Sequence, residues 1–377
     1  MKIILALNSF KDSCNSIEAN TALKIGLQKH FNKNDISVFP LFDGGDGSLA
    51  ALHYHLGFTK IKMKTTNALG RAIAAYYLID HNENIAYIEL AQASGIASIG
   101  KENNQILKAN TAGTGMMIKN ALKRGVSKIV LLIGGSATND AGVGALSTLG
   151  IQFLDKKGTP LLPIPAQMNN IRSIDKSGLV KNMVPIEIWS DVTNPFTGSL
   201  GAVAVYSAQK GASLADQRVL EKGMINFSNV IKRDYKIDLN KIKGAGAAGG
   251  IGAGFYSILG SSITQCTQSI FNMLHIHDRI RSTDLVITGE GRLDIQSMYG
   301  KLVHGLCKIS NKLNKPVIGL CGSKALTSGQ LRRLGMKAAF SIVRGPVSLE
   351  EALKSWRYNL VQAGENIGAF LKIMESK

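Results

Sequence analysis

The sequence has few cysteines and no membrane-length apolar run. Its 377 residues include four cysteines, none in a C-x-x-C pair. Such scattered thiols argue against a disulfide framework and are typical of a reducing cytoplasm. A transmembrane helix needs roughly 20 consecutive apolar residues, and no stretch approaches that length. The N-terminal MKIILALNSFKDS contains too short an apolar run for a signal peptide. We therefore expect a cytoplasmic protein with no membrane partner.

A Walker A loop, G-x-x-x-x-G-K-[ST], is also lacking. The nearest match ends in Gly300 and Lys301, but Ile295 stands where the first glycine is required. Any nucleotide chemistry of this chain is therefore not of the P-loop type.

Proline is scarce, at 8 residues, whereas glycine is abundant, at 40. This balance favours tight joints between strands and helices over rigid linkers. The formal net charge is +18, from 44 Lys and Arg against 26 Asp and Glu. Such a charge suits a nucleic acid or an anionic substrate, but the basic residues form no dense block and are typical of solvated helix faces. We predict no nucleic-acid partner.

The order of apolar patterns predicts an α/β protein with two domains. The chain exceeds the length that one hydrophobic core usually serves. Residues 2–7 and 35–42 form buried strand patterns around a helical pattern for which we predict Ser16 as the N-cap, and together they make a β-α-β unit. Three strand-like runs with short connections follow at 58–92, and one of them alternates apolar and charged residues, as an antiparallel strand does.

Strand and helix patterns alternate again in the last third, and a long helical region begins at Ser348. We predict one parallel-sheet domain built from both chain ends, residues 1–62 and 283–377. A second α/β domain with a mixed sheet, residues 63–282, is inserted in it.

Polar residues follow several predicted strands, where open α/β folds place their sites. Asp43 and Asp46 in DGGDGS suit a metal, a proton transfer or a turn; an EF-hand is excluded because Gly45 stands where Asp or Asn is needed. We expect Asp46 to cap the helix that follows. Ser9 and Lys11 in NSFKDS can meet a phosphate or a carboxylate.

The segment IGGSATNDAG links a strand to a helix and favours an anion site over a plain turn capped by Asp140. The residues expected to contact the anion are Gly134, Gly135, Ser136, Thr138 and Asn139.

The segment GAGAAG satisfies G-x-G-x-x-G, but the polar run before it is not a buried first strand, so we reject a dinucleotide fold. Its Gly246 and Gly249 suit either a phosphate or close packing of helices, and the sequence leaves both open.

Two more strand-end loops carry acids. Asp191 and Asn194 in SDVTNP suit either a site or an Asx turn. Glu290, Arg292 and Asp294 in ITGEGRLDIQS can hold Mg²⁺ together with a phosphoryl group, or form a structural ion pair. This mixture of acids, cations and Gly-rich loops indicates a small-molecule kinase or a related anion-handling enzyme.

The motifs, taken in order along the chain, resemble those of the bacterial glycerate kinase family of glycerate and glucarate breakdown. The resemblance extends from residue 1 to about 370 and is carried by NSFKDS, DGGDGS, QASG, GTG, GGSATNDAG, SDVTNP, GAGAAGG, ITGEGRLDIQS and GPVSLEEA. Two positions depart from the family pattern: Asn8 replaces the usual Asp, and Asp46 replaces the usual Glu.

The resemblance implies ATP- and Mg²⁺-dependent phosphorylation of D-glycerate to 2-phosphoglycerate. It also implies a Rossmann-like domain with the second domain inserted, and we expect the active-site cleft between the two. The family's charged motif residues fall on Lys11, Asp43, Asp191, Glu290, Arg292 and Asp294.

From these positions we expect Asp191, Lys11 and Arg292 to be catalytic, with Asp191 orienting the acceptor hydroxyl. Ser9, Asp43 and Asn194 are expected to bind substrate, and Glu290 and Asp294 the metal. The two Gly-rich loops would face ATP. A kinase of another small hydroxy acid and a non-catalytic basic ligand-binding or nucleic-acid-binding protein remain the alternatives.

Overall fold

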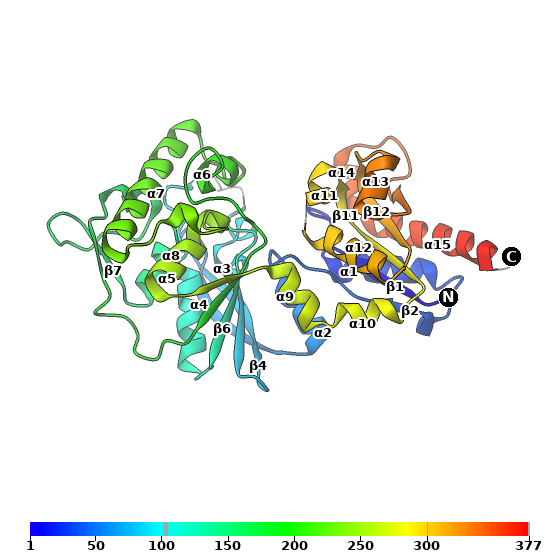
Figure 1. Ribbon diagram of the computed structural model, residues 1–377, viewed down its shortest axis with the longest axis horizontal. Helices are drawn as coiled ribbons and strands as arrows, with labels where there is room; N and C mark the ends of the chain where they lie inside the picture. The colour runs from blue at the N-terminus through cyan, green and yellow to red at the C-terminus, as the bar shows by residue number, and fades with distance from the viewer. Residues whose placement is uncertain (101–104, 300, 376–377) are drawn as a thin grey trace. The chain divides into compact units, whose positions relative to one another are not determined.

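The computed structural model describes residues 1–100, 105–299 and 301–375. The chain forms two compact units (Figure 1). Unit 1 comprises Met1–Asp43 and Thr267–Lys377, and unit 2 comprises Gly44–Cys266. The predicted insertion of one α/β unit into another is therefore confirmed.

The predicted limits of the insertion, 63–282, differ from those of unit 2. At the first limit, Glu89 binds backbone amides at the start of the helix that begins at Ser48, so this helix belongs to unit 2. At the second limit, Phe271 lies against Gly305, which ties its helix to unit 1.

Unit 1 is built on a five-stranded parallel sheet in the order β13-β12-β11-β1-β2. The strands are β1 (Ile3–Leu7), β2 (Ile36–Val38), β11 (Leu285–Leu293), β12 (Val317–Lys324) and β13 (Ala338–Ser341). All five residues of β1 are buried, as expected for a central strand covered on both faces. In the register, Ile3 pairs with Leu285 and Leu7 with Gly289, which joins the two ends of the chain in one sheet.

The helices of unit 1 are α1 (Ser16–Leu27), α9 (Cys266–Met273), α10 (Ile276–Arg281), α11 (Ile295–Tyr299), α12 (Lys301–Lys312), α13 (Ser328–Leu334), α14 (Leu349–Lys354) and α15 (Trp356–Glu375). Helix α1 is capped by Asn15, which forms a capping box with Glu18, one residue before the predicted cap at Ser16. Gly26 lets α15 pack closely on α1, because a Cβ there would lie 2.0 Å from the carbonyl oxygen of Val361.

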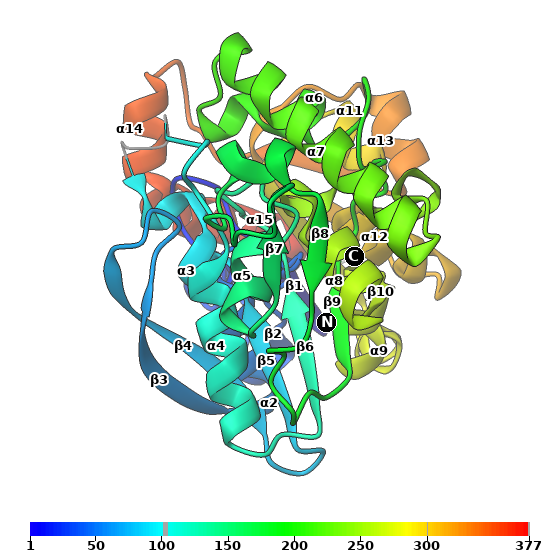
Figure 2. The same ribbon diagram turned by 90° about the vertical axis from the view of Figure 1, so that its left-hand side faces the viewer.

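Unit 2 contains a mixed six-stranded sheet in the order β10-β9-β6-β5-β4-β3. Its strands are β3 (Thr59–Thr66), β4 (Ala72–Asp80), β5 (Ile85–Glu89), β6 (Lys128–Leu132), β9 (Ile186–Trp189) and β10 (Ser262–Thr264). Strands β3, β4 and β5 are antiparallel neighbours, as the alternating pattern of β3 predicts for that strand, and β3 and β4 lie side by side in Figure 2. The pairs from β5 to β10 are parallel.

The helices of unit 2 are α2 (Ser48–Leu56), α3 (Ala91–Ser94), α4 (Ala112–Lys123), α5 (Val143–Thr148), α6 (Ala202–Tyr206), α7 (Leu214–Tyr235) and α8 (Ile251–Leu259), with a separate β7 (Gln152–Leu154) and β8 (Ser173–Asp175) hairpin. The core contains the fully buried rings of Tyr77, Phe153, Phe196, Phe227 and Phe255. Among the described residues, every helix is too short or too polar to cross a bilayer.

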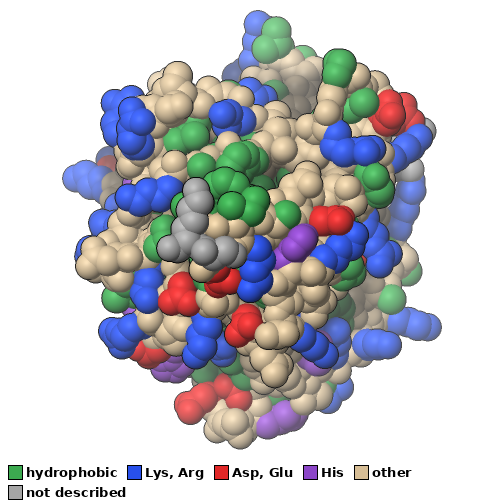
Figure 3. Space-filling view, turned by 90° about the vertical axis from the view of Figure 1, so that its right-hand side faces the viewer, with side chains coloured by type: hydrophobic (Ala, Val, Ile, Leu, Met, Phe, Trp, Pro, Cys, Tyr) green, Lys and Arg blue, Asp and Glu red, His purple; other side chains and the backbone are tan. Residues whose placement is uncertain are grey.

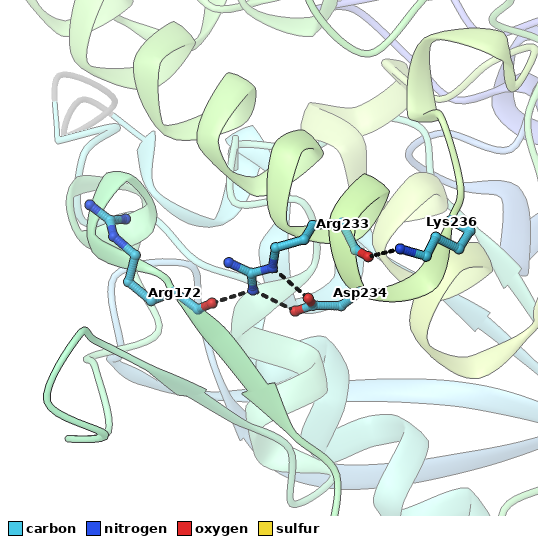
Figure 4. A network of polar contacts seen from close by, with 4 residues as sticks. All are labelled: Arg172, Arg233, Asp234 and Lys236. Carbon is cyan, nitrogen blue, oxygen red and sulfur yellow. Dashed lines mark hydrogen bonds and ion pairs between the residues drawn. The ribbon is translucent and has the colours of Figure 1, made fainter.

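A network of hydrogen bonds and an ion pair lies at the C-terminal end of α7 (Figure 4). Arg233 forms two bonds to Asp234 and donates to the carbonyl of Arg172 at 2.5 Å, while Lys236 donates to the carbonyl of Arg233 at 2.8 Å. Basic side chains here bind carbonyl groups near the end of the helix.

On one face of the molecule the basic residues are dispersed (Figure 3). On the face drawn in Figure 3, Lys and Arg side chains alternate with acidic and uncharged ones. This agrees with the prediction of solvated faces.

Candidate active site

Unit 1 contains a cavity of about 1190 Å³ at the carboxyl ends of β1 and β11. Six of the predicted site residues line it: Ser9, Lys11, Asp43, Glu290, Arg292 and Asp294. We call it the unit 1 pocket. These six include two cations and three carboxylates from segments that are far apart in sequence, and Asp12 and Arg344 also line the pocket.

The parallel sheet positions these side chains. The amide of Asn8 donates to the carbonyl of Gly289 at 2.9 Å, so β1 and β11 stay paired up to the point where the polar loops begin. Strand β11 then continues past the end of β1 and pairs with β12 as far as Leu293. The acids of β11 therefore stand beside the loop that carries Lys11.

Glu290 is the most enclosed acid of the pocket. Its Oε1 accepts a hydrogen bond from the Ser297 hydroxyl at 2.7 Å. Burial, followed by the charges of Asp43 and Asp294, raises the pKa of Glu290, and the charge of Lys11 opposes the rise. A further cation near these acids would relieve their mutual repulsion.

Arg292 and Asp294 form an ion pair, with Nε 3.1 Å from Oδ2. The Arg292 side chain is 70% exposed, so the pair contributes little to stability. Arg292 can therefore form this ion pair and still bind an anion, because its exposed guanidinium has further N–H donors.

The carboxylates suit Mg²⁺ held jointly with a ligand. Within the described part of the chain, no three His, Cys, Asp or Glu side chains lie together as a metal site of their own. Mg²⁺ is commonly held by one or two carboxylates together with water and substrate phosphates. The repulsion around Glu290 fits such a site.

The unit 1 pocket is also lined by apolar side chains, which the sequence analysis did not predict. We call Val347, Leu349, Leu353 and Trp356 the apolar wall; Val347 lies just before α14, Leu349 and Leu353 lie on α14, and Trp356 begins α15. Ser348 caps α14 as predicted and accepts from the amide of Glu351. Leu349 is 75% exposed, and an exposed apolar side chain beside a charged pocket suits a ligand with an apolar part.

The glycine-rich loops of unit 2 pack on one another through their backbones. A Cβ on Gly134 would lie 2.5 Å from the Cα of Gly45, and the Gly134 amide donates to the carbonyl of Gly44 at 2.9 Å. A Cβ on Gly249 would lie 2.1 Å from the carbonyl oxygen of Thr138. Close packing thus explains these glycines.

Gly246 is also packed closely against neighbouring backbone. A Cβ there would lie 2.2 Å from the carbonyl oxygen of Pro195, and its amide donates to the carbonyl of Asn194 at 3.0 Å. Of the two interpretations left open for GAGAAG, close packing has direct structural support. The amides of Gly134 and Gly246, expected to face phosphate, are bonded within unit 2.

The segment GGSATND is buried rather than open. Ser136, Thr138, Asn139 and Asp140 are each at most 5% exposed. Asp140 accepts bonds from the amides of Gly142 and Gly144, as in the capped turn considered from the sequence. It also accepts from the amide and the hydroxyl of Thr111, and burial raises its pKa despite these bonds.

Gly135 brings this segment close to the acid of a neighbouring loop. It has a φ of +72°, and a Cβ there would lie 3.0 Å from an Asp46 carboxylate oxygen. Asp46 therefore faces the GGSATND segment. The predicted cap at Asp46 is wrong, because the N-cap of α2 is Gly47 and the carboxylate that binds its first turn belongs to Glu89.

Asp191 and Asn194 also lie in unit 2, on the loop after β9. Asp191 is half-buried. The side chain of Asn194 is engaged at both ends: its Nδ2 donates to the carbonyl of Leu200 at 2.9 Å, and its Oδ1 accepts from Tyr206 at 2.6 Å. Asn194 therefore holds the loop together in this structure.

Lys210 is a buried lysine that the sequence analysis missed. Its amine donates to the Ser136 hydroxyl at 2.8 Å and to the carbonyl of Thr138 at 2.7 Å. The run AQKGAS around it carries no known pattern, so only the tertiary structure reveals the contact.

Comparison with known proteins gives full-length matches. The model of the Glycerate kinase family matches residues 3–372. Glycerate kinase of Bacillus cereus is 35% identical, with all of both chains covered. Glycerate 2-kinase of Escherichia coli is 35% identical over 99% of this chain and 98% of that protein. A crystal structure described as a glycerate kinase 2 of Salmonella typhimurium LT2 is similar with a TM-score of 0.83 and 36% identity, and all of both chains is covered.

Proposed function

Because the chain belongs to the glycerate kinase family and is a glycerate kinase, a small-molecule kinase, we propose that it transfers the γ-phosphoryl group of ATP to D-glycerate and forms 2-phosphoglycerate and ADP with Mg²⁺. The name of the Escherichia coli relative, glycerate 2-kinase, supports the position of the new phosphate.

The observation that carries this proposal is the composition of the unit 1 pocket. Lys11 and Arg292 offer positive charge, and Asp43, Glu290 and Asp294 offer oxygen ligands. Phosphoryl transfer depends mainly on positioning and on offsetting the charge of the phosphoryl oxygens. A volume of about 1190 Å³ exceeds what glycerate alone would fill, and the apolar wall suits the adenine ring.

In the proposed reaction, the role of each site residue follows from the charge of its side chain. Lys11 and Arg292 bind the substrate carboxylate or the transferring phosphoryl group, since both are anions. Glu290 and Asp294 would hold Mg²⁺, which would offset phosphate charge when bound. Asp43 and Ser9 contact glycerate, and Asp191 orients the acceptor hydroxyl and takes its proton.

The Gly-rich loops are assigned a supporting role and not ATP binding. Since the amides of Gly134 and Gly246 are bonded within unit 2, we propose that these loops support the Asp191 loop. ATP is then assigned to the unit 1 pocket.

A coupled assay with ATP and Mg²⁺ tests the activity. We expect turnover with D-glycerate, and ³¹P and ¹H NMR of the product to identify the 2-phospho ester. Turnover confined to another small hydroxy acid would overturn the assignment of D-glycerate as the substrate. Lack of turnover with every hydroxy acid, together with salt-dependent binding of DNA or RNA, would support the non-catalytic alternative.

A further inference from the structure

Lys210, the last residue of the short helix η5 (Ala208–Lys210), is an almost fully buried lysine in unit 2. It is 3% exposed. Lysine is rarely buried without a reason, because removing an amine from water is costly. Its two acceptors, the Ser136 hydroxyl and the carbonyl of Thr138, lie on either side of Ala137. One amine therefore fastens both ends of a single turn.

The turn held by Lys210 carries polar atoms that lack partners. Within the described part of the chain, Thr138 Oγ1 and both Nδ2 and Oδ1 of Asn139 are buried without a hydrogen bond. Each such atom lowers the stability of the fold, because it has given up its hydrogen bonds to water, and native proteins keep few of them. A turn that exists only to support the fold would not retain three, so the Ser136–Asn139 turn favours a functional role.

Contacts lead from this turn to the loop of Asp191. The amide of Ala141 donates to the carbonyl of Gly249 at 2.9 Å. In the same glycine segment, the amide of Gly246 donates to the carbonyl of Asn194 at 3.0 Å, three residues from Asp191. Gly246 and Gly249 are in tight contact with the neighbouring backbone, because a Cβ atom added to either would overlap it. A shift of the turn must therefore move the Asp191 loop.

The charge state of the amine fits its contacts. Burial lowers the pKa of Lys210 to about 7, and the charge of Asp140 opposes this effect. A neutral amine has two N–H groups, which equals the number of acceptors that it reaches. Lys210 can therefore fasten the turn without an ion pair.

We propose that Lys210 is a positioning residue for the phosphoryl transfer, which holds the Ser136–Asn139 turn and, through it, the Asp191 loop. This inference rests on the proposed function, because Lys210 would affect phosphoryl transfer only through the Asp191 loop. Lys210 adjusts the placement of Asp191 and does not bind the substrates.

Kinetics of Lys210→Ala and Lys210→Met test the proposal. We expect kcat to fall on the order of 10²-fold, since a misplacement of about 1 Å has such an effect, while KM for ATP and for glycerate changes by less than about threefold. Lys176→Met is the control, because Lys176, which is exposed, also donates to a backbone carbonyl of unit 2, that of Ile258 near the C-terminal end of α8. It should keep the wild-type kcat.

Chemical rescue separates positioning from general damage. Ethylamine or propylamine should restore kcat of Lys210→Ala in a saturable manner, whereas propanol should not, because only the amine supplies two N–H donors. A folded Lys210→Ala enzyme with kcat within threefold of wild type would overturn the proposal. Loss of activity that no amine restores would also overturn it.

If Lys210→Ala does not fold, Ser136→Ala keeps the amine and removes one acceptor. We then expect kcat to fall at least fivefold with both KM values unchanged, and an unchanged kcat would overturn the inference. A wild-type enzyme without glycerate turnover would count against the proposed function instead, so the two failures are distinguishable.

Discussion

The carboxylate of Glu89 caps helix α2: its Oε2 accepts a hydrogen bond from the amide of Leu49 at 2.9 Å. Its Oε1 accepts from the amide of Gly47 at 3.2 Å. Glu89 is 1% exposed and ends β5, so a strand supplies the group that the start of α2 lacks. Burial raises the pKa of Glu89 to about 7, and the two amide bonds oppose the rise.

Replacing Glu89 with Ala should destabilise the protein. The buried amide of Leu49 and the partly buried amide of Gly47 lose their acceptor, which costs about 1–3 kcal/mol. Urea denaturation followed by circular dichroism measures the change. Glu83→Ala, at an exposed acid on the turn before β5, is the control and should stay within about 0.5 kcal/mol of wild type. Equal effects of the two variants would contradict the role of Glu89.

Asp191→Asn should lower kcat on the order of 10²-fold or more, because an amide cannot take the proton of the acceptor hydroxyl. The amide keeps the size of the side chain, so the loop should stay intact. Steady-state kinetics with saturating ATP and glycerate measure the effect. Thr193→Ala, on an exposed residue of the same loop, should keep kcat. A near-normal kcat for Asp191→Asn would remove this residue from the proposed reaction.

The two acids of DGGDGS should behave differently. Asp43 lines the unit 1 pocket, whereas Asp46 lies beside Gly135. Asp43→Ala should abolish measurable turnover, because the pocket loses an oxygen ligand near Glu290. Asp46→Ala should retain turnover and change mainly the stability of the loop contact. A coupled assay and thermal unfolding of both variants check this, and comparable losses of activity would contradict the division.

Gly249→Ala should be strongly destabilising. Its φ is +70°, and a Cβ would lie 2.1 Å from the carbonyl oxygen of Thr138. Positive φ and overlap with rigid backbone together cost more than about 2 kcal/mol. Gly345→Ala is the matched control, because a Cβ there meets nothing within 4 Å. Equal unfolding midpoints for the two variants would refute the packing role of Gly249.

Lys210 should make stability rise with pH. Burial lowers its pKa from 10.5 to about 7, with the charge of Asp140 opposing. Between these values the unfolded chain holds a proton that the folded chain has lost, so the free energy of unfolding increases with pH. Lys210→Met titrates in neither state. The stability of wild type relative to Lys210→Met should therefore increase from pH 7 to pH 9 in urea denaturation. A difference that is independent of pH would contradict the lowered pKa.

The unit 1 pocket shows what strand patterns can predict. The run KIILAL and the β11 pattern identify central strands, and polar residues just past parallel strands must share an edge of the sheet. Lys11, Glu290 and Arg292 could therefore be placed together from sequence. Glu89 and Lys210 could not, because no strand or helix pattern in the sequence pairs them with their partners, which lie 40 or more residues away along the chain. The glycines of GAGAAG are similar, since only the folded chain shows which backbone approaches them.

The pairing of β1 with β11 sets an order of events during synthesis. Ile3 leaves the ribosome before its partner Leu285, which follows only after the whole of unit 2 has been made. At roughly 5–20 residues per second, the five apolar side chains of β1 wait about 15–55 seconds for that strand. Unit 2 is one continuous segment and can fold in the meantime. During this interval the β11-facing edge of β1 is therefore open to aggregation and to chaperone binding.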